Sequence, residues 1–312
     1  MNVVLLCPGQ GAQRVGMGRD LAAAYPVARR VFEAADEALG FSLSRVMWEG
    51  PEDLLTRTDN AQPAILAHSA AAWAVVREEL AGRVTAAAGH SLGEYSAYLT
   101  AGTLSLAEAA RLVRRRGELM REAGDVRPGT MAAVMGLDAE RVTLVCREAT
   151  SAGEVVVAAN LNAPDQTVIS GDPAAVARAS DLLKAAGAKR VLPLKVSGAF
   201  HSPLMAPVAE RFAAELAAAT LSAPAFPVVA NSSATAVREP AEARRLLADQ
   251  LTSPVRWVES VRRLAEVAGG AARFLEIGPG AVLTGLAKRI LTGSDTVNVG
   301  TAAEAAAFLE AT

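Results

Sequence analysis

The sequence is poor in the residues from which metal sites and disulfide frameworks are built. Its 312 residues include two cysteines and three histidines, and only 4% are aromatic. Cys7 and Cys146 stand in apolar surroundings without a C-x-x-C partner, so we expect both to be reduced core residues. Three histidines are too few for a metal centre built on a histidine cluster. We expect neither a metal nor a bound cofactor.

The chain also lacks an excess of charge and a long apolar run. Its formal net charge is −2 at pH 7. This balance argues against a protein that binds nucleic acid or a membrane surface through bulk charge. No run approaches the length of a transmembrane helix, and residues 1–7 have no basic region and are too short for a signal peptide. We therefore expect a cytoplasmic protein.

Apolar residues, in contrast, are abundant. They make up 51% of the sequence, which is enough for a large core. The length exceeds what one small core usually needs, so we expect two domains or one domain with an insertion. Strand patterns alternate with helical patterns, which predicts a mostly parallel sheet covered by helices on both faces.

Residues 89–93 read Gly-His-Ser-Leu-Gly, a G-x-S-x-G pattern. The small apolar residues 84–88 predict a buried strand before it, and residues 94–99 suit the start of a helix. A sharp strand-to-helix turn exposes the hydroxyl of Ser91 and points the amide of Leu92 at the place where an oxyanion forms. A serine that only caps a helix is the other interpretation, but the flanking pattern favours a nucleophile.

A second glycine-rich stretch, residues 8–13, follows the strand predicted at residues 3–7. Such a loop can cradle a phosphate, but Arg14 stands where the third glycine of G-x-G-x-x-G belongs, and no G-K-[ST] follows. The other interpretation is a loop that brings a backbone N–H close to a reacting atom. A nucleotide-binding module therefore remains an alternative based on this loop alone.

Three arginines in a row lie on the helix that begins after Ser105. At 100° per residue, Arg114 and Arg115 fall on the polar half of this helix, and we expect both to be solvated. Arg116 falls within the apolar half, where an unpaired guanidinium is costly. Its partner is either a structural acid or the carboxylate of a ligand, which a guanidinium binds with two parallel hydrogen bonds. The pattern favours neither.

One of the three histidines is a candidate general base for Ser91. His90 is adjacent to the serine, and His68 lies among alanines on a predicted helix, as a core residue would. His201 remains, in a loop between a strand and a helix that starts with proline. By elimination we assign it as the base, with a surface-loop histidine as the other interpretation.

The pattern of secondary structure changes between residues 128 and 196. The predicted elements are strand 131–135, helix 139–150, strands 155–161 and 166–170, helix 173–186 and strand 189–196. This order, βαββαβ, is typical of a ferredoxin-like unit. We therefore predict a small ferredoxin-like domain at 128–196, inserted into a larger α/β domain formed by 1–127 and 197–312, with a polar linker at 124–129.

Four motifs together resemble those of malonyl-CoA:acyl carrier protein transacylases, which load malonyl units for fatty acid synthesis. They are Pro-Gly-Gln-Gly-Ala-Gln at 8–13, Gly-His-Ser-Leu-Gly-Glu-Tyr at 89–95, Gly-Ala-Phe-His-Ser-Pro at 198–203 and Glu-Ile-Gly-Pro-Gly at 276–280. The motifs keep the order and spacing of that family, and the resemblance covers nearly the whole chain. It implies an α/β-hydrolase-like large domain with the ferredoxin-like insertion.

The resemblance also implies roles for single residues. Ser91 is the nucleophile and His201 the base, oriented by the backbone carbonyl of Gln250. The N–H groups of Gln10 and Leu92 form the oxyanion hole. Arg116 binds the malonyl carboxylate. Phe200 is similar to the malonyl-selective pattern, and Asn160 and Asn162 resemble residues beside the pocket.

The implied activity is ping-pong transfer of malonyl from malonyl-CoA to the phosphopantetheine thiol of acyl carrier protein. We expect a monomer whose partners are that carrier protein and CoA, without nucleic acid or membrane. Two alternatives share its chemistry. A discrete acyltransferase of a polyketide synthase has the same site, and a serine thioesterase or esterase uses the same Ser91 and His201 with water as acceptor.

Overall fold

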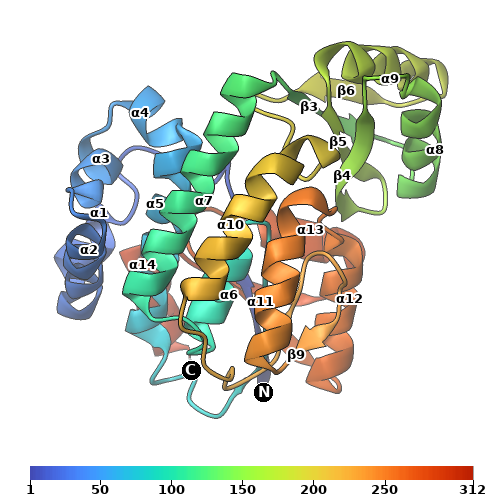
Figure 1. Cartoon of the computed structure of the whole chain (residues 1–312). Helices are drawn as coiled ribbons and strands as arrows, with labels where there is room; N and C mark the ends of the chain where they lie inside the picture. Colours follow the sequence, from blue (N-terminus) through green and yellow to red (C-terminus); the bar gives the residue numbers. More distant parts are fainter. Residues whose placement is uncertain (312) are drawn as a thin grey trace.

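A six-stranded sheet forms the centre of the computed structural model, which describes residues 1–311 (Figure 1). Its strands lie in the order β10-β9-β1-β2-β7-β8. All neighbouring pairs are parallel except β7 and β8, so the prediction of a mostly parallel sheet is confirmed. The strands are β1 (Asn2–Cys7), β2 (Val84–Gly89), β7 (Val228–Val229), β8 (Ala236–Val237), β9 (Ala272–Ile277) and β10 (Asp295–Val299).

Helices cover both faces of this sheet. Successive side chains of β1 point to opposite faces: Val3, Leu5 and Cys7 belong to one core cluster, and Val4 and Leu6 to another. Strands buried on both faces read as continuous apolar runs, as β1 does. The helices that belong with this sheet are α1 (Arg19–Ala24), α2 (Pro26–Leu39), α3 (Leu43–Glu49), α4 (Glu52–Thr56), α5 (Thr58–Val76), α6 (Gly93–Thr100), α7 (Leu106–Val126), α10 (Ala206–Ala218), α11 (Pro240–Asp249), α12 (Trp257–Ala268), α13 (Val282–Ile290) and α14 (Ala302–Glu310).

A second, antiparallel sheet has the strand order β4-β5-β3-β6 and a core cluster of its own. In the chain its elements follow the predicted order: β3 (Thr130–Met135), α8 (Ala139–Ala149), β4 (Val156–Ala163), β5 (Gln166–Gly171), α9 (Pro173–Ala185) and β6 (Arg190–Pro193). Asp138 caps α8 by accepting the Arg141 N–H at 2.7 Å. Figure 1 shows this sheet, in green and yellow, at one end of the molecule.

The two sheets are joined through the edge strand β4. The Leu161 N–H donates to the Val255 carbonyl at 2.9 Å, and the Val255 N–H donates to the Ala159 carbonyl at 2.8 Å. Val255 lies just before α12, and Arg289 of α13 also contacts Asp165 beyond the end of β4. The second sheet is therefore fixed against the helices that cover the first.

Three helix boundaries differ from the sequence prediction. The helix expected at 20–39 is two helices, α1 and α2, because Pro26 has no N–H to continue the first and suits the first position of the second. The helix expected to open at Gln62 and Pro63 begins at Thr58. The expected linker is also shorter, since α7 continues to Val126.

The early start of α5 has a specific cause. Pro63 cannot donate to the carbonyl of Asp59, four residues before it, which normally ends a helix. Here the Arg114 Nη1 group donates to that carbonyl at 2.8 Å.

No helix within residues 1–311 combines the length and hydropathy that a membrane span requires.

Candidate active site

Ser91 lies at a strained turn between β2 and α6. Its φ is 52°, in the left-handed region that non-glycine residues rarely adopt. A Cβ atom on Gly89 would lie 1.9 Å from the backbone of Gly93, and one on Gly93 would lie 2.1 Å from the carbonyl oxygen of Cys7. Both glycines of the motif are thus required by close backbone packing, and the turn holds Ser91 at the carboxyl end of β2.

Asn231 braces this turn, a role that our reading of the sequence missed. Its Oδ1 accepts the Ser91 N–H at 2.7 Å, and its Nδ2 donates to the Gly89 carbonyl at 2.7 Å. Its own N–H donates to Glu94 Oε2 at 3.0 Å. The available signal was its position just after the apolar residues of β7, because carboxyl ends of parallel strands share one edge of the sheet.

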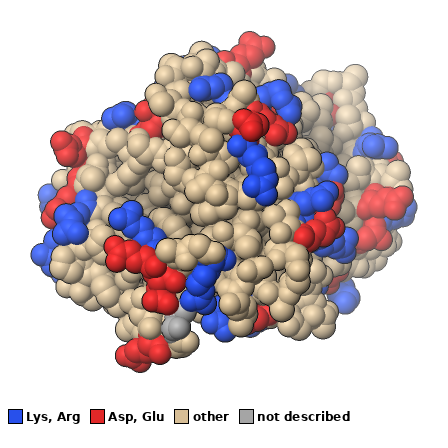
Figure 2. Space-filling model, turned by 90° about the horizontal axis from the view of Figure 1, so that it is seen from below, with Lys and Arg blue, Asp and Glu red and all other residues tan. Residues whose placement is uncertain are grey.

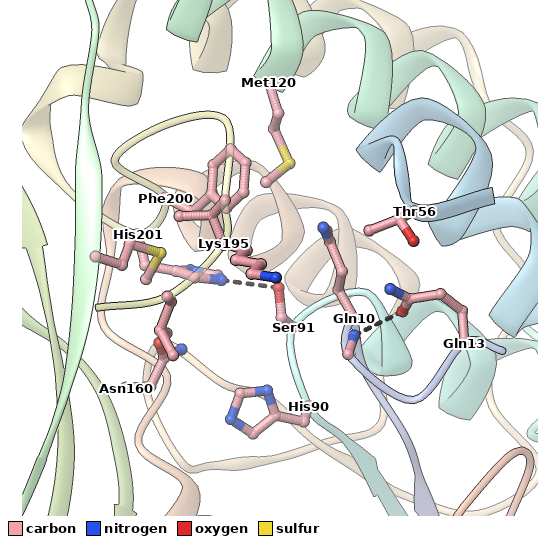
Figure 3. Close-up of a pocket in the computed structure, with 14 residues that line it drawn as sticks. Gln10, Gln13, Thr56, His90, Ser91, Met120, Asn160, Lys195, Phe200 and His201 are labelled. Carbon is pink, nitrogen blue, oxygen red and sulfur yellow. Dashed lines mark hydrogen bonds between the residues drawn. The ribbon is translucent and has the colours of Figure 1, made fainter. Parts of the chain in front are cut away.

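His201 is hydrogen-bonded to Ser91 and oriented by backbone carbonyls. Its Nε2 lies 2.8 Å from Ser91 Oγ (Figure 3). Its Nδ1 lies 3.0 Å from the Gln250 carbonyl oxygen and 3.2 Å from that of Ser253. Because carbonyls only accept, Nδ1 carries the hydrogen, and Nε2 is left to accept the Ser91 proton.

The imidazole is neutral in this site. Burial, together with the nearby charge of Arg116, lowers the pKa of His201 to about 3. A neutral imidazole with a free Nε2 lone pair is the form that a general base needs.

Arg116 is 1% exposed and reaches the serine from α7. Its Nη1 donates to Gln62 Oε1 at 2.7 Å, and its Nη2 donates to Gln250 Oε1 at 2.9 Å and to Ser91 Oγ at 3.1 Å. The sequence left two partners open, an acid or a ligand carboxylate, and the hydrogen-bond acceptors present are amide and hydroxyl oxygens. Because the hydrogen-bond acceptors of this buried cation are all neutral, its charge is uncompensated and attracts an incoming anion.

The side chain of Gln250 is held by Glu94. Gln250 Nε2 donates to Glu94 Oε2 at 2.7 Å and to the Ser91 carbonyl at 3.0 Å, which leaves Oε1 directed at Arg116. Burial raises the pKa of Glu94 to about 7, although the hydrogen bond from Gln250 opposes this shift. Gln250 thus contributes its amide group to the site as well as the carbonyl that the sequence resemblance implied.

Arg114 and Arg115 are not freely solvated, which corrects the sequence prediction. Both are half-buried. Arg114 pairs with Asp59 at 3.4 Å and Glu118 at 2.8 Å, and Arg115 pairs with Glu215 at 3.1 Å. Glu118 lies on the same helix, but Asp59 comes from α5 and Glu215 from α10, and the position of a residue on its own helix cannot indicate such partners.

A cavity of about 310 Å³ opens at Ser91 between the two sheets (Figure 3). It is lined by Gln10, Gly11, Gln13, Thr56, His90, Ser91, Met120, Met131, Asn160, Leu194, Lys195, Val196, Phe200 and His201. The glycine-rich loop after β1 thus lines the same cavity as the serine. Within residues 1–311, neither the Gln10 nor the Leu92 N–H donates a hydrogen bond, so both donors are available. Among the described residues that line the cavity, none is acidic.

The other two histidines, His90 and His68, make hydrogen bonds to groups other than Ser91. His90 lines the cavity with its Nε2 2.8 Å from Asn162 Oδ1, and its ring packs 5.5 Å from that of Trp257. His68 is buried, with its Nε2 2.6 Å from the Gly300 carbonyl oxygen, which confirms the prediction of a core residue. Cys7 and Cys146 are both free and buried, as predicted.

Comparisons with known proteins agree with this geometry. The profile of the acyl transferase domain family matches residues 4–306. A malonyl CoA-acyl carrier protein transacylase of Bacillus subtilis (strain 168) is 46% identical over 300 residues, which are 96% of this chain and 93% of that protein. A transacylase of the same name from Salmonella typhimurium is 44% identical over 96% of each chain.

Solved structures of similar proteins share the fold. An acyl carrier protein S-malonyltransferase from Vibrio cholerae superposes with a TM-score of 0.93 at 42% identity, over 99% of this chain and 100% of that chain. A malonyl-transacylase in complex with its type II PKS acyl-carrier protein superposes with a TM-score of 0.95 at 42% identity, over 100% of both chains. The chain therefore belongs to the acyl transferase family, and within it to the malonyl-CoA:acyl carrier protein transacylases.

Proposed function

We propose that this chain transfers a malonyl group from malonyl-CoA to the phosphopantetheine thiol of acyl carrier protein, in fatty acid synthesis. The observation that carries this proposal is the convergence on Ser91 Oγ of His201 Nε2 at 2.8 Å and Arg116 Nη2 at 3.1 Å. A serine and a histidine serve any acyl group. The buried guanidinium adds a positive charge, which selects an acyl group that carries a carboxylate.

In the first half-reaction, Ser91 Oγ attacks the thioester carbon while His201 Nε2 takes its proton. The negative charge on the carbonyl oxygen develops against the N–H groups of Gln10 and Leu92, and one such donor is typically worth about 10²–10³ in rate. The carbon–sulfur bond then breaks, and His201 gives its proton to the departing CoA sulfur. Arg116 holds the carboxylate of the malonyl ester left on Ser91.

In the second half-reaction, the carrier-protein thiol attacks the ester. His201 takes the thiol proton and returns it to Ser91 Oγ as the ester bond breaks, so the kinetics are ping-pong. Every group in this cycle is supplied by the chain and its two substrates. We propose that no metal or cofactor is needed, that the protein acts as a monomer, and that it works in the cytoplasm.

A second pathway shares this chemistry. The structural similarity to a transacylase solved with a type II PKS acyl-carrier protein favours a polyketide carrier protein as an additional acceptor. A serine thioesterase or esterase is disfavoured, because a simple ester gives Arg116 nothing to bind.

We further propose that residues 128–196 form a ferredoxin-like domain inserted into an α/β-hydrolase-like domain made of 1–127 and 197–312. The strand order β4-β5-β3-β6 and the separate core of the second sheet support this division. Met131 and Leu194 from the inserted part line the cavity beside Ser91, so both domains contribute to the site.

Incubation with malonyl-CoA, followed by intact mass and peptide mapping, tests the function. We expect one malonyl group on the peptide containing Ser91, none in S91A, and release of that group on addition of holo acyl carrier protein. CoA released continuously without an acceptor thiol would indicate a thioesterase. A label that survives in S91A would contradict the assignment of the nucleophile.

A further inference from the structure

We infer that Thr58 is a positioning residue for this reaction: its hydroxyl ties Gln10 of the glycine-rich loop to Arg116 through Gln62. The inference rests on the proposed function, in which the Gln10 N–H belongs to the oxyanion hole. Thr58 is the first residue of α5 and does not line the cavity.

Three hydrogen bonds connect the four side chains. Arg116 Nη1 donates to Gln62 Oε1 at 2.7 Å. Gln62 Nε2 donates to Thr58 Oγ1 at 3.0 Å, and Thr58 Oγ1 donates to Gln10 Oε1 at 2.9 Å. Arg116, Gln62 and Thr58 are all buried, so water does not compete for these groups.

The direction of these bonds is fixed from one end. A guanidinium has donors and no acceptor, so Gln62 must present its oxygen to Arg116 and its NH₂ group to Thr58. The Thr58 oxygen then accepts from Gln62, and its single hydrogen is directed to Gln10. The three hydrogen bonds can therefore run in only one donor-to-acceptor direction, from Arg116 to Gln10.

Gln10 needs such a tether because its own backbone is weakly restrained. It is exposed and lies between Gly9 and Gly11, whose φ is 102°. Glycine neighbours leave the backbone many conformations, and holding one of them costs entropy. Within residues 1–311, the bond from Thr58 is the hydrogen bond that holds the Gln10 side chain.

Thr58 is itself held independently of Gln10. Its neighbour Asp59 pairs with Arg57 at 2.8 Å and with Arg114 at 3.4 Å. Gly117, next to Arg116 on α7, allows the close approach, since a Cβ there would lie 2.7 Å from the Thr58 carbonyl oxygen. The start of α5 is therefore a fixed point from which Thr58 can restrain the loop.

The substitution T58V tests the inference, because valine keeps the shape of threonine and removes the hydroxyl. We expect the rate constant for acylation of Ser91 to fall about tenfold, a fraction of the 10²–10³ typical for losing one oxyanion donor. KM should change less than about twofold, because the lost contact acts in the transition state. Acetyl-CoA should lose the same factor as malonyl-CoA, since both form the same oxyanion.

The variant T58S should restore the rate, because it returns the hydroxyl without the methyl group. Q10M removes the acceptor at the other end of the Thr58 hydrogen bond, and Gln10 is exposed, so the change should not disturb the fold. The acylation rate constant of Q10M should fall about as much as that of T58V, and that of the double variant should fall no further. T103V is the matched control, since Thr103 is 2% exposed and its hydroxyl has no partner within residues 1–311. It should keep the wild-type rate.

Acylation of T58V or Q10M at the wild-type rate would overturn the inference, as would a T58S variant as slow as T58V. A change in KM alone would also overturn it, because a binding effect does not report on the oxyanion. Absence of any malonyl label on the wild-type chain would instead refute the proposed function. The two failures are therefore distinguishable.

Discussion

At the scale of single residues, the site combines a neutral base with a buried cation. His201 Nδ1 faces carbonyl oxygens, and Arg116 faces amide oxygens, so within residues 1–311 neither is paired with a carboxylate directly. Glu94 is linked to Arg116 through the amide of Gln250. This arrangement keeps negative charge at a distance from the place where the malonyl carboxylate is proposed to bind.

Replacing Arg116 should remove the discrimination between charged and neutral acyl groups. A hydrogen bond to a charged group is worth about 1.5–3 kcal/mol, so R116A should lose roughly 10- to 100-fold in kcat/KM for malonyl-CoA. Acetyl-CoA should lose less, which competition between the two thioesters measures. R115A, one position along the same helix, serves as the control and should keep the malonyl preference. An unchanged preference in R116A would remove Arg116 from the acyl pocket.

The titration of Glu94 should appear in the stability of the protein. Its folded pKa of about 7 lies above the ordinary value of 4.5 because burial disfavours the charged form. The folded state therefore holds a proton that the unfolded state has lost, and stability falls as the pH rises from 4.5 to 7. Denaturant unfolding should show this loss, about 3 kcal/mol, in the wild type relative to E94Q. Parallel curves for the two proteins from pH 5 to 8 would contradict it.

The lowered pKa of His201 predicts how acylation depends on pH. With a pKa of about 3, the imidazole stays neutral down to pH 5, whereas an ordinary histidine would be mostly protonated there. Single-turnover acylation of E94Q, in which Glu94 no longer titrates, should therefore remain level from pH 8 to 5. A decline centred near pH 6.5 would show that His201 titrates normally.

At the scale of helices and strands, α5 and α7 pack with unusually close backbones at Gly117. A Cβ there would lie 2.7 Å from the backbone of α5. G117A should therefore destabilise the fold by about 1–3 kcal/mol, as overpacking does. The control is G285A in α13, where a Cβ has nothing within 4 Å. Because alanine favours a helix over glycine, G285A should raise the melting temperature. A higher melting temperature in G117A would mean that the helices can separate without cost.

Sequence patterns predicted these elements where the signal was local. The strands predicted at 3–7 and 84–88 and the helices predicted at 139–150 and 173–186 all appear within one residue of the expected bounds. We did not predict β8 and β10, because β8 has two residues and β10 is half-exposed with a polar start. The start of α5 depends on a contact from Arg114, which no local pattern contains.

The site residues also differ in whether local sequence indicates them. The flanking glycines indicate Ser91, and its position on the apolar side of a helix indicates Arg116. Asn231 and Thr58 act through hydrogen bonds to residues 140 and 48 positions away, so their neighbours in sequence say nothing about them. The carbonyl of Gln250 was expected only from family resemblance, since a backbone group has no sequence signature.

At the scale of the whole molecule, charge is spread without a dominant sign. Figure 2 shows basic and acidic side chains interspersed around an uncharged centre on the face it displays, in keeping with a net charge of −2. The cavity differs, because its lining includes Lys195 and, in the part of the chain that the structure describes, no acidic side chain. Attraction of an anionic substrate should therefore arise locally at the cavity.

Removing the charge of Lys195 should weaken this attraction. We expect K195M to lower kcat/KM for malonyl-CoA several-fold at low ionic strength, with wild type and variant converging in high salt, where such fields are screened. K184M, on the outer side of α9, is the control and should behave as wild type at every salt concentration. A deficit in K195M that persists in high salt would point to direct contact rather than attraction at a distance.

The backbone acceptor that orients His201 has an evolutionary consequence. A catalytic acid can be deleted by one nucleotide change, whereas a peptide oxygen is present whichever amino acid is encoded at position 250. Saturation mutagenesis there should abolish the contacts of the Gln250 amide while the imidazole keeps its orientation, so many alleles should retain weak turnover. The orientation of the base therefore does not depend on which side chain position 250 carries.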